Sequence, residues 1–433
     1  MTAAGDLGDL RDEIATCMRC GFCQAVCPVY KEVRREPAVA RGKVALAEAL
    51  LRGELEPNAD VARQLDLCLT CKACVDACPS GVPVDEVILA ARAEIVRQRG
   101  LAWMKSAIFE AVKRPRVLDA GVATAARLQG LAMGAGPDDS LGVLRLPVSR
   151  EKRPVVPRIP SRPLRASHGS AGHLPDPAGR VVFYPGCMIT YVYPEIGRAL
   201  VSVLAAERIE VAIPSENHCC GVPMLMHGDV ETAKQMARAL ITALDALGDG
   251  PVLTACPTCG SALKHHVPRL LGAEPAWAPR AQRLAARTYD ATEYLVDELR
   301  LDDAPVRSPL KVTYHDPCHL ARGQGVRSQP RELIERVAGA ELIELASPEV
   351  CCGGAGSFQL THAGLAADIG AHKASEVEAT GADTVVTSCP GCRLQLTDSL
   401  NRRGRSVRVC HTLELLAETR AANTRRAATR GAV

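Results

Sequence analysis

The stretch Cys17–Pro28, "CMRCGFCQAVCP", carries four cysteines and recurs as "CLTCKACVDACP" at Cys68–Pro79. Both stretches have the spacing C-x2-C-x2-C-x3-C-P. A cubane [4Fe–4S] cluster needs four thiolates, and three thiols at two-residue spacing wrap one corner of such a cluster. We therefore expect two cubane [4Fe–4S] clusters near the N-terminus.

The ligands of these clusters are expected to be exchanged between the two runs. In two-cluster ferredoxins, the fourth thiol of each run binds the cluster that the other run holds. The expected ligand sets are Cys17, Cys20, Cys23 and Cys78 for one cluster, and Cys68, Cys71, Cys74 and Cys27 for the other. Zinc is the alternative, but zinc sites favour two separated pairs of ligands. The third cysteine at the same spacing and the proline after the fourth favour iron–sulfur clusters.

The cysteine count indicates a reducing compartment. The chain has 433 residues and 19 cysteines, whereas disulfide frameworks are typical of short secreted chains. The start, "MTAAGDLGDLRDE", has no apolar core of a secretory signal, and no run of 18 apolar residues predicts a transmembrane segment. We expect a cytoplasmic protein that reaches the inner face of the membrane only through partners.

Charge and composition argue against a nucleic-acid partner. The 52 basic and 49 acidic residues leave a net charge of +3, and aromatic residues make up 3% of the chain. Nucleic acids and anionic lipids attract strongly basic surfaces, and single strands need aromatic stacking platforms. The length predicts two or three domains.

The first predicted domain, residues 1–100, is a mainly helical ferredoxin-like module that holds both runs. Residues 40–55 and 83–99 have helical patterns, and the second has acidic residues in its first turn. Residues 101–180 are expected to form a helical segment, which Pro115 should break, followed by a Pro/Arg-rich linker.

From residue 181 onward, short β-rich runs each end at a cysteine: "VVFYPGC", "VLTACPTC", "KVTYHDPC" and "TVVTSCPGC". Helical stretches separate these runs, and this alternation predicts α/β lobes with mostly parallel sheets. The fold class is therefore α+β overall, with a helical module followed by α/β lobes.

The α/β part repeats itself. The separation is 131 residues from Cys187 to Cys318, 132 from Cys219 to Cys351, and 133 from Cys256 to Cys389. This near-constant offset predicts two homologous lobes, 181–300 and 309–416, related by a pseudo-two-fold axis. The basic tail, residues 417–433, is expected to be disordered.

Each lobe brings five cysteines to three separate loops. The candidate metal ligands are Cys187, Cys219, Cys220, Cys256 and Cys259 in the first lobe, and Cys318, Cys351, Cys352, Cys389 and Cys392 in the second. If the loops follow strands, the thiols converge at the carboxyl ends of a sheet, where open α/β sheets bind ligands. Five thiols exceed the need of one cubane. Spacing leaves open zinc, a cubane with a spare thiol, and a larger cluster.

At this point the chain resembles a known family. The two lobes look like the cysteine-rich CCG domains of heterodisulfide reductase catalytic subunits. The pairing with a two-cluster module is similar to the glycolate oxidase iron–sulfur subunit family, above all in "CLTCKACVDACPSGV", "HDPCHLARGQGVRSQPRELI" and "CCGGAGSFQL". The resemblance covers nearly the whole chain except the linker and the termini.

The resemblance implies a division of labour. An FAD-containing partner subunit oxidises a 2-hydroxy acid, glycolate or D-lactate, and this chain passes the electrons towards a quinone or another membrane acceptor. It further implies one or two additional iron–sulfur clusters in the CCG lobes, which are noncubane [4Fe–4S] clusters in the heterodisulfide reductase relatives. The alternative function is reduction of a disulfide at a CCG-bound cluster. A third interpretation is a scaffold with structural zinc in the lobes.

The chain departs from the family pattern in two places. Cys389 stands where many glycolate-type subunits have Asn, which favours the disulfide-reductase pattern. "ARGK" at 40–43 replaces the usual Ser-Pro-Arg-Gly-Arg stretch. The sequence has no flavin or nicotinamide fingerprint, so the hydride acceptor is expected in a partner.

Some polar residues near the cysteines have open roles. His218, His315 and His319 flank lobe cysteines, and each is a candidate to donate a hydrogen bond to a cluster sulfur, to shuttle protons or to bind a substrate carboxylate; the alternative is a satisfied loop residue. Arg322 and Arg327 are candidates for binding a carboxylate. No catalytic residue is assigned from the sequence.

Overall fold

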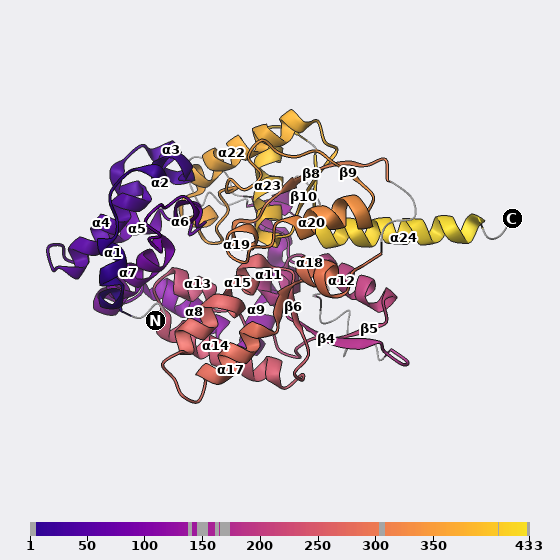
Figure 1. Ribbon diagram of the computed structural model, residues 1–433, viewed down its shortest axis with the longest axis horizontal. Helices are drawn as coiled ribbons and strands as arrows, with labels where there is room; N and C mark the ends of the chain where they lie inside the picture. The colour runs from indigo at the N-terminus through magenta and orange to yellow at the C-terminus, as the bar shows by residue number, and fades with distance from the viewer. Residues whose placement is uncertain are drawn as a thin grey trace.

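The computed structural model consists of a helical N-terminal module beside two α/β lobes (Figure 1). It describes residues 6–136, 141–144, 155–160, 164, 174–302, 308–405 and 407–430. The module is the indigo part of Figure 1, and the second lobe is drawn in orange and yellow. Among the described residues, none of the helices combines the length and the apolar composition that a membrane span requires.

Two cysteine loops and a pair of long helices build the N-terminal module. Helices α4 (Ala40–Leu51) and α7 (Val84–Arg99) pack together through a core that includes Val44 and Ile88. Both helices lie where their patterns predict, although α4 ends at Leu51. The shorter elements are η1 (Leu7–Leu10), α1 (Arg11–Ala15), α2 (Phe22–Val26), α3 (Pro28–Val33), η2 (Glu36–Ala38), α5 (Ala59–Asp66) and α6 (Ala73–Asp76).

The first lobe contains a parallel four-stranded sheet in the order β5-β4-β6-β7. Its strands are β4 (Gly179–Phe183), β5 (Ile209–Ala212), β6 (Val252–Thr254) and β7 (Thr288–Asp290). The first strand in the chain is thus central, between the second and the third. The order reverses at this strand, and open α/β sheets bind ligands at the carboxyl ends of the strands at such a point.

The second lobe has the same topology. Its sheet has the order β11-β10-β8-β9 and is also parallel. The strands are β8 (Lys311–His315), β9 (Glu341–Leu342), β10 (Thr384–Thr387) and β11 (Arg408–His411). When the strands of each lobe are numbered along the chain, both sheets have the order second, first, third, fourth. This shared order confirms the predicted repeat.

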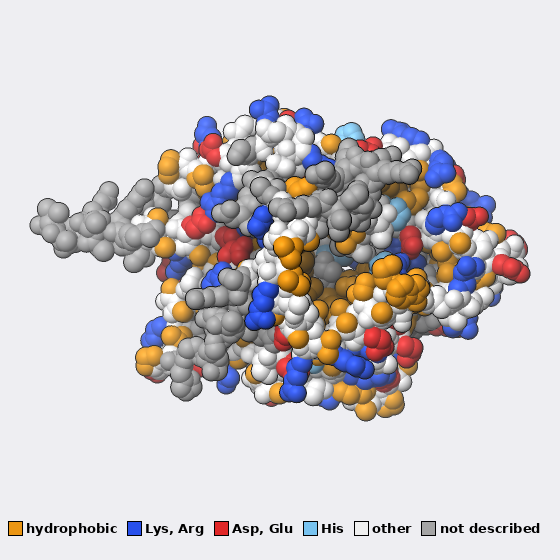
Figure 2. Space-filling model, turned by 180° about the vertical axis from the view of Figure 1, so that it is seen from behind, with side chains coloured by type: hydrophobic (Ala, Val, Ile, Leu, Met, Phe, Trp, Pro, Cys, Tyr) orange, Lys and Arg blue, Asp and Glu red, His pale blue; other side chains and the backbone are white. Residues whose placement is uncertain are grey.

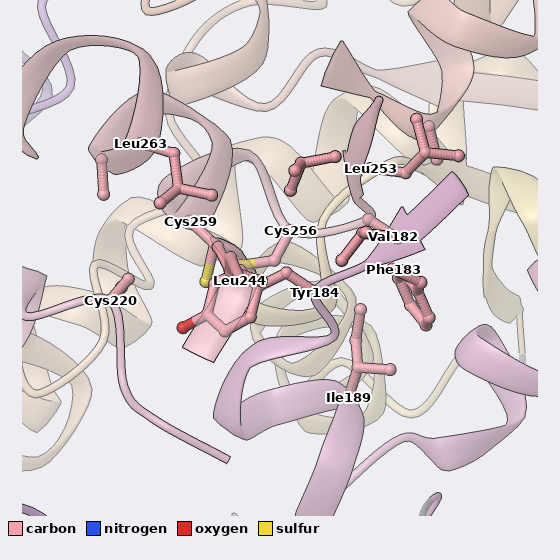
Figure 3. Close-up of a cluster of buried hydrophobic side chains, with 14 of the residues drawn as sticks. Val182, Phe183, Tyr184, Ile189, Cys220, Leu244, Leu253, Cys256, Cys259 and Leu263 are labelled. Carbon is pink, nitrogen blue, oxygen red and sulfur yellow. The ribbon is translucent and has the colours of Figure 1, made fainter. Parts of the chain in front are cut away.

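Helices cover the sheets and bury continuous apolar strands, as parallel sheets require. In the first lobe these are α11 (Gly186–Tyr191), α12 (Pro194–Ala206), α13 (Val222–Met226), α14 (Val230–Asp245), α15 (Pro257–Ser261), η3 (Ala262–His266), α16 (Val267–Leu271), α17 (Ala278–Ala286), α18 (Ala291–Glu293) and η4 (Tyr294–Glu298). In the second they are α19 (Cys318–Ala321), α20 (Ser328–Glu332), η5 (Leu333–Val337), α21 (Phe358–Thr361), α22 (Ala363–Thr380), α23 (Pro390–Arg402) and α24 (Thr412–Arg430). Figure 3 shows Phe183 and Leu253 in the core of the first lobe.

The lobes face each other with the helices that follow the cysteine loops. Helix α15 of the first lobe packs on α19 of the second, and α11 of the first packs on α23 of the second. In each contact, the helix after the third strand of one lobe packs on the helix after the first strand of the other lobe. This exchange fits the predicted pseudo-two-fold axis. As a result, the carboxyl ends of both sheets point towards the interface.

The segment between module and lobes is helical at first. Helices α8 (Trp103–Val112) and α9 (Pro115–Ala132) confirm the predicted break at Pro115, which opens α9. Part of the expected linker instead joins a small antiparallel sheet of β1 (Met133–Ala135), β2 (Leu141–Leu144) and β3 (Val155–Pro157). The remainder of the expected linker up to 173, except residues 158–160 and 164, lies outside the described residues.

The prediction of a disordered tail is wrong for residues 417–430. Helix α24 continues through Arg430, and it packs on α12 of the first lobe. Leu413 and Leu416 are buried in that contact, and Arg420 forms an ion pair with Glu207. Alanine and arginine are strong helix formers, so a buried first turn extends readily along the tail. Residues 431–433 lie outside the described residues.

Candidate iron–sulfur sites

The eight cysteines of the N-terminal module line two cavities. One is lined by Cys27, Cys68, Cys71 and Cys74. The other is lined by Cys17, Cys20, Cys23 and Cys78, and also by Cys74, which lines both cavities. Each cavity therefore combines three thiols of one run with the fourth thiol of the other. This is the grouping that the sequence predicts, and the binding of a cluster by each set stays a prediction.

The backbone of the two runs has the same unusual shape. Arg19 and Gly21 have φ values of 55° and 91°, and the equivalent Thr70 and Lys72 have 52° and 61°. Left-handed residues other than glycine are uncommon and cluster at functional sites. The left-handed residues bend each loop around its thiols. In the second loop, the Thr70 N–H donates to the Cys68 sulfur over 3.4 Å. Hydrogen bonds to sulfur tune the potential of an iron–sulfur cluster.

Burial makes these thiols poor acids without a cation beside them. Desolvation raises the pKa of Cys27 to about 11. Desolvation, followed by the neighbouring Cys68, also raises the pKa of Cys74. Metal ligation requires thiolates and releases their protons. The residues therefore fit a cationic iron cluster, which supplies the positive charge that the buried thiolates need.

Lys43 is a buried cation that the sequence analysis missed. It is 2% exposed on the inner face of α4, lines the cavity of Cys27 and Cys68, and donates to the Ala38 carbonyl. Gly42 beside it is required for close packing, because a Cβ there would lie 2.0 Å from the Glu36 carbonyl oxygen. The stretch "ARGK" thus places a tight helix contact and a buried lysine, whose pKa burial lowers, at a thiol site. The sequence feature that could have indicated its burial is the spacing of Lys43, one helical turn from Ala40 and one from Ala47, which are both buried.

The five thiols of the first lobe form one connected group. Cys187 shares a hydrogen bond with Cys219, and Cys219 shares one with Cys220. Cys220 contacts Cys259 in the same way, and Cys259 contacts Cys256. These hydrogen bonds, first the one from Cys219, lower the pKa of Cys220 to about 5. Figure 3 shows Cys220, Cys256 and Cys259 around the ring of Tyr184.

The second lobe repeats this group in the same order. Cys318 contacts Cys351, which contacts Cys352, which contacts Cys392, which contacts Cys389. The pKa of Cys352 is again lowered, first by the hydrogen bond with Cys351 and then by that with Cys392. All ten lobe thiols are free of disulfides and the cysteine pairs are buried. Five converging thiols in each lobe fit an iron–sulfur cluster.

The glycine of each "CCG" motif has a steric reason. Gly221 and Gly353 have φ values of 79° and 89°, where side chains are strained. A Cβ on Gly353 would lie 3.0 Å from the Ala366 carbonyl oxygen, and one on Gly221 would lie 3.3 Å from that of Ala233. The left-handed turn after the cysteine pair therefore holds both thiols toward the sheet edge.

The N-terminal module meets the second lobe thiol to thiol. Cys71 shares a hydrogen bond with Cys351, and both belong to one small apolar core with Phe358. Arg322 and Arg327 hold this junction together. Arg322 lies 3.3 Å and Arg327 3.4 Å from the same carboxylate oxygen of Asp76 in the module, and both pair with Glu349 of the lobe. The carboxylates that these arginines bind are thus the chain's own.

Two of the three candidate histidines have partners away from the thiols. A ring nitrogen of His319 lies 3.0 Å from the Thr258 hydroxyl, and the other lies 3.2 Å from the Thr70 carbonyl. His319 therefore joins both lobes to the module. His218 lies 3.9 Å from Glu216 and accepts the Tyr184 hydroxyl on its backbone oxygen. His315 differs, because its side chain reaches the thiols of Cys352 and Cys392.

The fold and the sites define an iron–sulfur protein with a dicluster module and two cysteine-rich domains. Residues 13–82 match the 4Fe-4S dicluster domain family, and residues 181–264 and 312–397 each match the CCG cysteine-rich domain family. A relative described as "Probable glycolate oxidase iron-sulfur subunit", from Bacillus subtilis, is 32% identical over 94% of both chains. The chain belongs to the glycolate oxidase iron–sulfur subunit family.

Other relatives share parts of this architecture. A subunit of the fumarate reductase (CoM/CoB) from Methanothermobacter marburgensis is 30% identical over 92% of this chain and 71% of its own. "Lactate utilization protein A" from Geobacillus kaustophilus is 33% identical over 55% of this chain and 98% of its own. A solved structure, a hypothetical protein from Helicobacter pylori, matches 95% of this chain and 75% of its own, with a TM-score of 0.51 and 8% identity, a likeness of fold alone.

Proposed function

We propose that this chain is the electron-transfer subunit of a flavin-linked 2-hydroxy-acid dehydrogenase that oxidises glycolate or D-lactate. In this proposal, an FAD-containing partner delivers electrons to the N-terminal module, and the lobes pass them towards a quinone or another membrane acceptor. When bound, iron–sulfur clusters take up and release electrons at potentials that the protein sets.

The contact between Cys71 and Cys351 is the observation that carries the proposal. One thiol lines a cavity of the dicluster module, and the other belongs to the five-thiol group of the second lobe. If each group holds a cluster, adjacent ligands bring the two clusters close together. A lone binding module has no need of such a junction, whereas a conducting chain requires one.

The exposure of the other end of this chain of thiols supports a donor partner there. Cys20 is exposed, whereas Cys71 is buried. Met18 and Phe22 on either side of Cys20 are 68% and 64% exposed. A partner that covers this apolar rim would bring its flavin near the outer cavity, and exposed apolar patches are typical of such interfaces. The space-filling view shows that apolar side chains also gather on the rear face of the molecule (Figure 2).

An anaerobic purification from the native cells tests this function. We expect a flavoprotein to accompany the chain, and glycolate or D-lactate to bleach both the flavin and the iron–sulfur absorption. The matched control is 2-hydroxyisobutyrate, which has no hydrogen on its 2-carbon and should bleach neither. A brown, flavin-free protein whose absorption ignores both acids would overturn the proposal.

A second candidate function is reduction of a disulfide at a lobe cluster. The specific observation in its favour is that both lobes keep five connected thiols, including Cys389. The test is turnover of small-molecule disulfides by the isolated chain with reduced viologen as donor. Turnover that is lost in Cys389→Asn would favour this candidate, and no turnover would remove its support.

A further inference from the structure

The two lobes carry different residues at an equivalent position beside their thiols. Three residues before the first cysteine, the first lobe has Tyr184 and the second lobe has His315. Both side chains are buried, at 1% exposure each. The Tyr184 hydroxyl donates to the His218 carbonyl over 2.7 Å, so its polar atom is satisfied within the protein.

His315 points its imidazole into the thiol group instead. A ring nitrogen of His315 and the sulfurs of Cys352 and Cys392 all lie within 4.8 Å of one another. These two thiols come from different loops of the lobe, so three segments converge on one point. Nitrogen and sulfur donors in this arrangement are typical of transition-metal sites.

The His315 ring contacts the Cys352 thiol, but one of its nitrogens lacks a hydrogen-bond partner among the described residues. Its Nδ1 is buried and has no hydrogen-bond partner in the part of the chain that the structure describes. Buried polar atoms are almost always paired, and an unpaired one beside metal-ligating groups is explained by an ion that binds there. The backbone of His315 is fixed, because its carbonyl accepts from the Thr387 hydroxyl over 3.1 Å. The backbone that carries the ring is thus fixed beside the thiols, and one ring nitrogen is left for a ligand.

We propose that a ring nitrogen of His315 binds iron in the cluster of the second lobe, as a sixth donor beside the five thiols. The proposal rests on the iron–sulfur character of the lobe and not on the identity of the hydroxy acid. The first lobe offers thiols alone, so the two lobe clusters are chemically different. In Rieske centres histidines replace anionic thiolates and so raise the potential, whereas His315 adds a donor and removes no thiolate.

The test uses the full-length holoprotein, purified anaerobically after labelling its histidines with ¹⁵N. Pulsed electron paramagnetic resonance of the lobe clusters, poised in turn by reduction and oxidation, should show nitrogen coupling of the size of a metal-bound imidazole. The coupling should disappear in His315→Gln and persist in His319→Gln, whose ring nitrogens already have partners. A redox titration should show a changed potential for the second-lobe cluster in His315→Gln, with the first-lobe cluster unchanged.

Several outcomes would overturn the proposal. Coupling that survives in His315→Gln would assign the nitrogen to another residue. Iron-loaded wild-type protein without strong coupling, or an anaerobic crystal structure with no bond from His315 to iron, would exclude the ligand without any variant. None of these measurements uses a hydroxy acid or a partner, so their failure is distinct from a failure of the proposed function.

Discussion

Protonation of His411 should loosen the contact between the two lobes. His411 ends strand β11 of the second lobe, and its Nε2 donates to the Ala255 carbonyl of the first lobe over 3.1 Å. The Leu413 N–H donates to Nδ1 over 3.2 Å, so the ring is neutral and both nitrogens are used. Complete burial lowers the pKa of His411 from 6.5 to about 3.

The sign and size of the effect follow from this pKa. In the unfolded chain His411 is protonated below its ordinary pKa of 6.5, whereas in the folded chain it stays neutral down to a pKa of about 3. The stabilisation is therefore complete above pH 6.5 and is lost as the pH falls from 6.5 to 3. Between about pH 7.5 and about pH 5.5 the loss from this one group is about 1.4 kcal/mol.

The variant His411→Gln isolates this contribution. Glutamine keeps a donor for Ala255 and an acceptor for Leu413, but it does not titrate. Urea unfolding of the holoprotein at about pH 7.5 and about pH 5.5, followed anaerobically by circular dichroism, should show that wild type loses about 1.4 kcal/mol more than the variant. His266, whose pKa burial also lowers to about 3, acts equally in both proteins. Equal losses in the two proteins would refute the reasoning.

Three further substitutions test the sites. Cys71→Ser should remove about four iron atoms, the content of one cubane, and should block reduction of the lobes by the partner. The control is Cys410→Ser, which changes a buried thiol outside all four cysteine groups and should leave the iron content unchanged. Gly353→Ala should lower the unfolding free energy by about 1–3 kcal/mol, because the new Cβ would meet the Ala366 carbonyl oxygen at 3.0 Å in addition to the strain at positive φ that Gly356 shares. The matched Gly356→Ala has open space around its Cβ and should cost less; equal costs would argue against a steric role. Arg92→Met should leave the Leu65, Cys68 and Met226 carbonyls without the hydrogen bonds that Arg92 now donates. The free energy of unfolding in urea should fall by about 1–3 kcal/mol, and an unchanged midpoint would contradict this.

Much of the fold was predictable because its signals are local. The β-rich runs that end at cysteines became the strands β4, β6, β8 and β10, and the 131–133-residue offset became two sheets of one topology. The tail was not predictable in this way. Its helix depends on α12, a segment about 200 residues earlier in the chain, and the composition of the tail alone does not reveal that contact.

The candidate sites divide in a similar way. Spacing alone predicted which thiols of the module would share a cavity, because ligand exchange follows from the repeated motif. The roles of the histidines stayed open, since His315 and His319 flank the same cysteine. Their surroundings separate them: His319 binds Thr258 and Thr70, whereas His315 faces Cys352 and Cys392.

The sequence by itself determined the donor atoms, their grouping along the chain and the strands that carry them, because these depend on residue type and on short-range spacing. Only the tertiary structure decided that the module abuts the second lobe through Cys71 and Cys351, that Lys43 is buried beside thiols, and that His411 ties the lobes together. Each of these contacts joins residues that are distant in the chain or depends on which face of a helix is covered. The packing of whole domains sets such contacts, and no local pattern encodes them.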